Sequence, residues 1–400
     1  MKASYPRRLY KELQRHLHQR QATVLTGMRR SGKTTLIQRL LEELPSKNKL
    51  YLDFEQIENR MLFSEKNYDA IVHFLEQRHR INFKEKAYVA LDEIQLVPNL
   101  PSVVKYLYDT YDIKWFLTGS SSYYMKNLFH ESLAGRKKIF ELYPLDFGEF
   151  LDFKGVFHRE VLDLFEPSLL QTFLSHEYER LRPYYEEYIR YGGFPEVVLA
   201  AGREEKENIL KDIVSSYVNM DIEVLSDFRK KNKLIDLMKL LTTRAGSRID
   251  VAELSRVLGI SGITVESYLQ FFQDTYLISR IPVHTKNRDR EIVKANKLYF
   301  HDTGILNILG EASSGAQFEN AIYAQLRRFG EVRYYAQKSG REIDFVLDGK
   351  LGFEAKERPT NQDNLKLIRL KNTAELSQTR LIGRHETPGF QDYIWGGNIH

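Results

Sequence analysis

A glycine-rich loop that ends in a lysine and two threonines is the part of this sequence best suited to chemistry. The residues from Gly27 to Thr34 read GMRRSGKT and fit the pattern G-x-x-x-x-G-K-[ST]. In such a loop the backbone N–H groups turn inward around a phosphate, and the N-terminus of the following helix adds unpaired donors. We expect Lys33 to reach the β- and γ-phosphates of ATP and the Thr34 hydroxyl to ligate Mg²⁺. The residues expected to contact the nucleotide here are Gly27, Arg30, Ser31, Gly32, Lys33, Thr34 and Thr35.

Two acidic residues supply the second half of the predicted site. Asp92 and Glu93 directly follow the apolar run Tyr88–Leu91, which predicts a buried strand with both acids at its C-terminal end. There Asp92 can hold the Mg²⁺ shell, and Glu93 can orient and deprotonate the attacking water. Lys33 and Glu93 are therefore expected to be catalytic.

Three polar residues farther along the chain each leave two interpretations open. Thr118 and Ser120 follow the apolar run Trp115–Leu117, and either one senses the γ-phosphate or both cap the next helix. Arg136 lies in the loop after that helix. It is either a catalytic arginine finger that enters the ATP site of a neighbouring subunit, or one partner of a surface ion pair.

The elements that must position these residues alternate along the first 150 residues. Leu9, Leu13 and Leu17 are four apart, which predicts an amphipathic helix in residues 7–21, and a second helix is expected over Thr34–Leu44. Strands interleaved with helices are typical of a largely parallel sheet covered on both faces, so the expected fold class is α/β. The apolar runs that predict the strands are Ala22–Leu25, Leu50–Phe54, Tyr88–Leu91, Trp115–Leu117 and Lys138–Leu142.

Two short helices joined by a tight turn form a candidate element for binding DNA. Helices are predicted at Asp250–Leu258 and Ile263–Asp274, and the intervening Gly-Ile-Ser-Gly completes a helix-turn-helix. The segment Arg280–Lys297 is locally basic and suits nucleic-acid phosphates, with an affinity that salt would weaken. Such helix pairs also serve protein contacts, and basic residues are common on solvated loops. The cations are Arg280, Lys286, Arg288, Arg290, Lys294 and Lys297, against Asp289 and Glu291.

The C-terminal segment contains a second possible metal site. Residues 342–347 and 351–356 predict a β-hairpin around an Asp-Gly turn, and alternation places Glu354 and Lys356 on one face, within reach of Asp344. Asp-x(n)-Glu-x-Lys is the constellation of the PD-(D/E)xK nuclease fold. In that fold the carboxylates hold Mg²⁺ or Mn²⁺, and the lysine helps to position or activate water.

Two details bear on this nuclease-like set. Glu319, in a helix predicted at about residues 315–328, matches a further metal-binding acid of resolvase-like members of the fold. Ile343 stands where the motif name has a proline. The alternative for Glu354 and Lys356 is a cross-strand ion pair on a solvated face.

Composition limits the remaining possibilities. The chain has 400 residues, no cysteine and a formal net charge of +5. The lack of cysteine excludes disulfides, a thiol nucleophile and cysteine-ligated metal sites. No apolar run approaches the ~18 residues of a membrane span, and the first residues lack the apolar core of a signal peptide. We therefore expect a multidomain cytoplasmic protein without a membrane partner.

Further motifs follow the loop and the two acids in a set order: Thr118–Ser120, Leu133–Arg136, Leu142–Phe150, Gly192–Glu196, Asp274–Ile278 and Lys297–Gly304. Together they resemble prokaryotic AAA+ ATPases related to the STAND group, in the subfamily with a C-terminal domain of unknown function. The resemblance implies a parallel sheet of strand order 5-1-4-3-2, and it implies that Gly193 and Pro195 pack against adenine. The implied domains are a P-loop AAA+ core (1–150), a helical lid (151–235), a winged helix (236–300) and a restriction-endonuclease-like α/β tail (301–400).

The leading hypothesis is an ATP-driven machine of the helicase or branch-migration type. It would bind and remodel DNA that is forked, junction-containing or single-stranded, with ATP and Mg²⁺ as cofactors. Because a finger arginine must come from a neighbour, such motors form homo-oligomeric rings. One alternative is a STAND-like signalling switch without DNA activity. Another is a nucleotide-dependent nuclease of the defence or mobile-element type.

Overall fold

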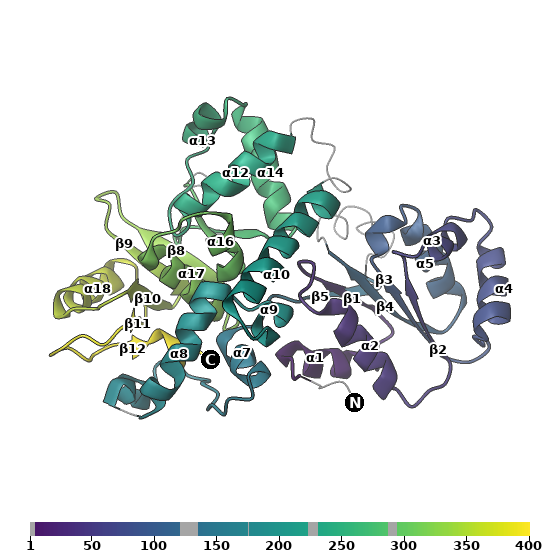
Figure 1. Cartoon of the computed structure of the whole chain (residues 1–400), viewed down its shortest axis with the longest axis horizontal. Helices are drawn as coiled ribbons and strands as arrows, with labels where there is room; N and C mark the ends of the chain where they lie inside the picture. The colour runs from purple at the N-terminus through teal and green to yellow at the C-terminus, as the bar shows by residue number, and fades with distance from the viewer. Residues whose placement is uncertain (1–4, 121–134, 175, 223–230, 287–293) are drawn as a thin grey trace. The chain divides into compact units, whose positions relative to one another are not determined.

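The chain folds into two compact units, seen in the computed structural model of Figure 1. The first consists of Met1–Tyr143 with the short segments Asn219–Ser226 and Asp274–Tyr276, and the second contains the rest. No helix within the described ranges is both long enough and apolar enough to cross a membrane. The structure describes residues 5–120, 135–174, 176–222, 231–286 and 294–400.

A five-stranded parallel sheet forms the centre of the first unit, in the order β2-β3-β4-β1-β5. This is the order that the family resemblance implies, counted from the opposite edge, and it confirms the α/β class for this unit. Every strand begins and ends within two residues of the apolar run that predicted it. The strands are β1 (Ala22–Thr26), β2 (Lys49–Asp53), β3 (Ala87–Asp92), β4 (Ile113–Gly119) and β5 (Lys137–Glu141).

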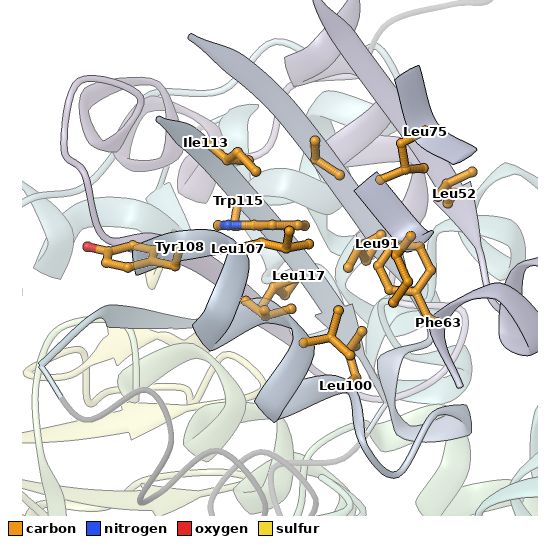
Figure 2. Packing of buried hydrophobic residues seen from close by; sticks show 14 of the residues in the cluster. Leu52, Phe63, Leu75, Leu91, Leu100, Leu107, Tyr108, Ile113, Trp115 and Leu117 are labelled. Carbon is orange, nitrogen blue, oxygen red and sulfur yellow. The ribbon is translucent and has the colours of Figure 1, made fainter. Parts of the chain in front are cut away.

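Helices cover both faces of this sheet. Phe116 of β4 packs in the core under α1 and α2, whereas Trp115 and Leu117 pack in the core under α4 and α5. Figure 2 shows Leu107 of α5 beside Trp115. Adjacent residues of a strand point to opposite faces of the sheet, so the short run Trp115–Leu117 of β4 contributes side chains to both hydrophobic cores. The helices are α1 (Arg8–His16), α2 (Lys33–Glu43), α3 (Ile57–Phe63), α4 (Tyr68–His79), η1 (Ile94–Leu96) and α5 (Leu100–Thr110).

The second unit begins with a helical region and continues into mixed structure. Between Phe147 and Asp274 the described elements are helices, as expected for this part of the chain. They are α7 (Phe147–Phe153), η2 (Pro167–Leu174), α8 (His176–Tyr191), α9 (Pro195–Leu199), α10 (Arg203–Ser216), η3 (Tyr217–Ile222), α12 (Lys231–Leu240), η4 (Leu241–Arg244), α13 (Val251–Leu258) and α14 (Gly262–Asp274).

The predicted helix pair is formed by α13 and α14. The Asp250 side chain accepts a hydrogen bond from the N–H of Glu253 and so caps α13, which ends at Gly259 with φ of 65°. The strands β6 (Ile278–Ile281) and β7 (Lys297–Phe300) follow as an antiparallel pair. Arg288, Asp289, Arg290 and Glu291 of the basic segment lie outside the described residues.

A second five-stranded sheet, in the order β12-β11-β10-β9-β8, forms the C-terminal part of the second unit. The predicted hairpin is β9 paired antiparallel with β10, and its turn places Asp348 and Gly349 at positive φ, as an Asp-Gly turn requires. Along the chain, α17 is followed by three strands, a helix and a further strand. The elements are α16 (Thr303–Leu309), α17 (Ser314–Leu326), β8 (Val332–Ala336), β9 (Glu342–Leu347), β10 (Leu351–Lys356), α18 (Asn361–Thr373), β11 (Gln378–Gly383), β12 (Ile394–Trp395) and η5 (Gly396–Asn398).

Three of the motif segments meet in one buried cluster of the second unit. The N–H of Gly193 donates to Asp302 Oδ2 at 2.7 Å, and its carbonyl oxygen accepts from the N–H of Leu145 at 2.7 Å. A Cβ at Gly193 would lie 2.1 Å from the Leu145 oxygen, and one at Gly192 would lie 2.2 Å from Asp302 Oδ1. Close packing therefore requires both glycines.

We expect Asp302→Asn to destabilise the second unit by about 1–3 kcal/mol. Both carboxylate oxygens of Asp302 accept backbone N–H groups, from Gly193 and from Ile305, so an amide NH₂ would leave one donor buried without a partner. Urea denaturation followed by circular dichroism measures the loss. The matched control is Asp250→Asn, because the exposed Asp250 accepts one backbone N–H and an asparagine oxygen can replace it. Equal stability of the two variants would contradict the prediction.

Candidate functional site

The glycine-rich loop joins the end of β1 to the start of α2, the frame that its sequence predicts. Gly27 has φ of 153°, and a Cβ there would lie 2.1 Å from the carbonyl oxygen of Leu142, so a larger residue would displace the loop. Gly32 has φ of 98° and forms the N-cap of α2. Arg30 is also at positive φ. Both glycines are thus needed to turn the backbone toward a phosphate.

Lys33 lies inside this loop. Its ammonium group donates to the carbonyl oxygens of Gly27 at 2.8 Å and Met28 at 3.0 Å, and the residue is 5% exposed. The loop therefore holds a buried cation against its own carbonyl oxygens.

Asp92 gathers three hydroxyl donors at the C-terminal edge of the sheet. Thr34 Oγ1 and the Tyr51 hydroxyl each donate to Asp92 Oδ2 at 2.7 Å, and Thr118 Oγ1 donates to Oδ1. The C-terminal ends of parallel strands lie at one edge, so β2, β3 and β4 deliver Tyr51, Asp92 and Thr118 to the same place. The structure therefore brings together the predicted residues Thr34, Asp92 and Thr118.

Glu93 is held by two neighbours in a sparsely populated backbone conformation. Its φ is 53°, a left-handed value that non-glycine residues adopt mostly at functional or strained positions. Gln95 Nε2 donates to its carboxylate and also to Ser120 Oγ at 3.1 Å. The Arg29 guanidinium lies 3.6 Å from Glu93 Oε2. These contacts restrain the expected general base beside the phosphate loop.

Arg7 ties the start of the chain to the same loop. One guanidinium nitrogen donates to the carbonyl oxygen of Ser31 at 2.9 Å, and another donates to the carbonyl oxygen of Tyr143 at 2.7 Å. The side chain therefore connects the loop to the second residue after β5.

The predicted nuclease-like residues lie together in the second unit. Asp344 on β9 and Glu354 on β10 face each other across the hairpin, where the N–H of Asp344 donates to Glu354 Oε2 at 3.2 Å. Lys356 pairs with Glu354 Oε1 at 2.8 Å, with Lys356 half exposed and Glu354 largely buried. The ion pair of the alternative interpretation is present, but it lies within β10 instead of across two strands, and its acid is not solvated. Glu319 on α17 joins the same cluster through the buried ammonium of Lys297.

Burial is the main influence on the acids of this cluster. Burial and then the nearby Asp344 carboxylate raise the pKa of Glu319 to about 7 and that of Glu354 to about 8. Among the described residues, no group of three or more His, Asp or Glu side chains is arranged to hold a metal ion. The cluster is therefore compact and acidic, but its geometry does not fit a metal.

A pocket of about 410 Å³ adjoins this cluster. Three exposed cations, Arg341, Lys366 and Arg369, line it together with Glu342 and Glu354. Arg341 and Arg369 form no ion pair with any side chain in the described part of the chain. Asp363 also lines the pocket and lies 4.0 Å from the Lys366 ammonium, so three cations stand beside three acids. Arg341 and Arg369 are the two cations of the pocket that remain available to an outside anion.

The cations of the basic segment that the structure describes are engaged within the second unit. Arg280 pairs with Glu266 of α14, and Lys286 pairs with Glu375. Lys294 Nζ donates to the carbonyl oxygen of Ala336 at 2.9 Å. Lys297 is buried among carboxylates. Lys286 stays exposed beside its partner, whereas Arg280 and Lys297 are largely buried by theirs. A phosphate-binding basic strip therefore stays a prediction, and within it Lys297 is already enclosed by acids of the chain.

Residues 19–151 match the family model described as an AAA domain. This segment is similar to an AAA domain, and the words AAA domain denote residues 19–151 from here on. The chemistry expected of the glycine-rich loop and of the two acids at the end of β3 agrees with that family. Residues 182–316 match a second model, described as a domain of unknown function (DUF8612).

Similar proteins occur in bacteria and archaea. An uncharacterized protein of Haemophilus influenzae is 27% identical over 86% of this chain and 85% of its own length. An uncharacterized protein of Methanocaldococcus jannaschii is 27% identical over 82% of this chain and 72% of its own. Among solved structures, the ORC2 protein of Aeropyrum pernix covers 70% of this chain and 88% of its own, at 14% identity and a TM-score of 0.40. A similarity at this TM-score supports no inference about the function of this chain.

Arg136 lies on the surface of the AAA domain. Its guanidinium pairs with Asp109 of α5 at 3.1 Å, which is the surface ion pair that the sequence leaves open. The arginine-finger role requires a neighbouring subunit and stays a prediction. Gly193 and Pro195 belong to the second unit, where the buried Asp302 cluster accounts for Gly193, and their contact with adenine also stays a prediction.

The side chains of the AAA domain fit ATP with Mg²⁺. The loop glycines allow the backbone to approach phosphate, and Lys33 supplies a cation. Thr34 and Asp92 bring together the hydroxyl and carboxylate oxygens that Mg²⁺ prefers, and phosphate and water complete such a shell. Thr34 and Asp92 are therefore the residues that would hold the metal.

Four residues of the site were missed by sequence reasoning: Arg7, Arg29, Tyr51 and Gln95. Tyr51 lies on a predicted strand that neighbours β3, so its closeness to Asp92 could have been predicted from the strand order. Arg29 and Gln95 are next to predicted residues, but their pairing with Glu93 depends on side-chain directions. Arg7 carries no sequence signal, because its partners are backbone carbonyl groups far along the chain.

We expect Tyr51→Phe to weaken Mg²⁺-dependent ATP binding by about 0.5–1.5 kcal/mol, or about two- to tenfold in Kd. The variant removes one of the three donors that orient Asp92, whereas nucleotide binding in EDTA should be unchanged. Isothermal titration calorimetry with and without Mg²⁺ measures both values. Tyr88→Phe, on β3 itself, is the control and should match the wild type. An equal loss in EDTA would assign Tyr51 a structural role instead.

Proposed function

We propose that this protein is an AAA+ ATPase that uses ATP hydrolysis to bind and remodel DNA, of the forked, junction or single-stranded type. The observation that carries the ATPase part is the meeting of Thr34, Asp92 and Thr118 beside the loop that encloses Lys33. A cytoplasmic location and a homo-oligomeric ring, with Arg136 as the finger, are part of the same proposal.

The chemistry follows from the positions of these side chains. Mg²⁺ bound by Thr34 and Asp92 would neutralise charge on the phosphates. The Lys33 ammonium exchanges its loop carbonyl partners for phosphate oxygens when ATP enters. Glu93 orients the attacking water and accepts its proton, for which its carboxylate must leave Gln95 and Arg29. Hydrolysis is therefore coupled to a rearrangement around Glu93.

Two features of the second unit support the DNA part of the proposal. The helix pair α13 and α14 followed by the strands β6 and β7 has the order of elements of a winged helix. The exposed Arg341 and Arg369 line a pocket of the tail and form no ion pair among the described residues, so they suit the phosphates of a nucleic-acid backbone. We propose that the tail contacts DNA through this pocket and that residues 151–235, 236–300 and 301–400 act as lid, winged helix and tail.

The second candidate function is a STAND-like switch without DNA activity. One observation favours it: the described cations of the basic segment pair internally, for example Arg280 with Glu266. In that case the helix pair would bind another protein. Whether ATP or ADP is bound would control the assembly of the protein into oligomers. DNA dependence of hydrolysis separates the two functions.

We expect forked or single-stranded DNA to stimulate ATP hydrolysis, and we expect DNA binding to weaken steeply between low and moderate salt. Phosphate release is measured with duplex, single-stranded, forked and four-way DNA at two salt concentrations. Lys33→Ala should lose nucleotide binding. Glu93→Gln should retain ATP and hydrolyse it about 10²–10⁴-fold more slowly, the usual contribution of a general base. If no DNA changes the rate of ATP hydrolysis and no DNA binds at low salt, the result would favour the signalling switch.

Replacing Arg341 and Arg369 by alanine should reduce DNA affinity and lower the salt slope by about 2, since each phosphate contact contributes about 0.9 to it. Fluorescence anisotropy of labelled DNA across a salt series measures both quantities. The control is Arg203→Ala, which removes an exposed cation paired with Glu207 on α10. ATP hydrolysis without DNA should stay unchanged in all variants. An unaltered slope in the double variant would remove the pocket from the DNA contact.

A further inference from the structure

Lys297 is a buried cation at the centre of the nuclease-like cluster. It is the first residue of β7 and therefore comes from the hairpin after the helix pair, outside the motif hairpin formed by β9 and β10. Its ammonium lies 3.0 Å from Asp344 Oδ1, 3.2 Å from Glu342 Oε1 and 3.5 Å from Glu319 Oε1, and the side chain is 2% exposed. A lysine so enclosed is held by its acids, because an unpaired buried charge would cost several kcal/mol.

The acids expected to bind a metal are already occupied by donors of the chain. Asp344 Oδ1 accepts from Lys297, and its Oδ2 accepts from the N–H of Ala355 at 3.1 Å. Glu354 Oε1 contacts the Lys356 ammonium, and its Oε2 accepts from the N–H of Asp344.

The remaining acid is occupied in the same way. Glu319 Oε1 accepts from the Tyr299 hydroxyl at 2.6 Å, in addition to its contact with Lys297. Tyr299 lies two residues after Lys297 on β7, so one short strand supplies donors to two of the acids. The donors around Asp92 are neutral, whereas this set encloses a buried ammonium group, which repels a divalent ion.

We propose that Lys297 is the resident cation of this carboxylate site, in the position that Mg²⁺ would take in a nuclease of this fold. A second cation beside a buried ammonium would meet strong repulsion at a low local dielectric, so the lysine excludes the metal. The nuclease-like tail is then a domain that contacts nucleic acid without cutting it. This inference rests on the proposed function only for the nucleic-acid contact, since the exclusion of metal is independent of it.

The same contact has a structural consequence. Lys297 joins the strand pair β6 and β7 to α17 through Glu319 and to β9 through Glu342 and Asp344. The helix pair and the tail are thus connected by a buried ionic junction in place of a metal. An element that carries DNA contacts and an element with a nuclease-like fold would then move as one body.

The test is Mn²⁺ binding to the full chain without nucleotide, followed by electron paramagnetic resonance. Wild type and Asp344→Asn should bind the same amount of Mn²⁺, because the tail contributes no site. Lys297→Met removes the cation at similar length and should create a site that binds Mn²⁺ at least about tenfold more tightly than anything in the wild type. The double variant Lys297→Met/Asp344→Asn should lose that site. The AAA domain contributes the same background throughout, since Thr34 and Asp92 are unchanged.

Wild-type Mn²⁺ binding that disappears in Asp344→Asn would overturn the inference. A folded Lys297→Met variant without the new site would also overturn it, because another group would then exclude the metal. If circular dichroism shows that Lys297→Met does not fold, the comparison of wild type with Asp344→Asn decides. DNA-stimulated ATP hydrolysis is measured on the same samples. Its absence would refute the DNA function and leave the metal result standing.

Discussion

The carboxylate of Asp92 is the interaction on which the nucleotide site depends. Hydroxyl groups from α2, β2 and β4 converge on its two oxygens, so one buried acid links the phosphate loop to three strands of the sheet. The charge is tolerated because every contact is a donor, and the same oxygens can turn toward a metal ion when a triphosphate arrives. Glu93 directly follows Asp92, so the hydrogen bonds of Asp92 also fix the position of Glu93. The backbone of Glu93 has a strained, left-handed φ at the turn after β3.

The phosphate loop and the acids at the end of β3 require different properties of the backbone. The loop needs residues without side chains, because a Cβ at Gly27 would collide with the chain after β5. The acids need a rigid strand end, which β3 provides by pairing on both sides within the parallel sheet. Arg7 and Arg29 then connect loop and strand ends through contacts that a phosphate could displace or redistribute. Such a site can change its hydrogen bonds without losing the sheet that supports it.

The second unit is organised around two buried charges instead of a nucleotide. Asp302 binds the backbone of the Gly192-Gly193 turn and thereby explains why three separate motifs accompany one another. Lys297 binds three acids and joins the strand pair after α14 to the tail. Lys297 has partners that are all distant in sequence, and Asp302 joins a distant partner, Gly193, to a near one, Ile305. Each charge connects separate segments of the second unit. If Lys297 excludes a metal as we propose, the carboxylates of the tail serve to hold this lysine.

The sequence alone determined the phosphate loop, the acids of β3, the five strands and the tail hairpin. Each of these is specified by local patterns: glycines at required φ values, apolar runs of strand length and an Asp-Gly turn. Only the tertiary structure decided the partners of the charged groups. Arg7, Tyr51 and Lys297 act through residues between 22 and 136 positions away, and Arg280 and Lys286 are paired internally. Local patterns predict where a chain is helical or extended, but the partner of a long flexible charged side chain depends on which distant oxygens the folded chain brings within about 3 Å.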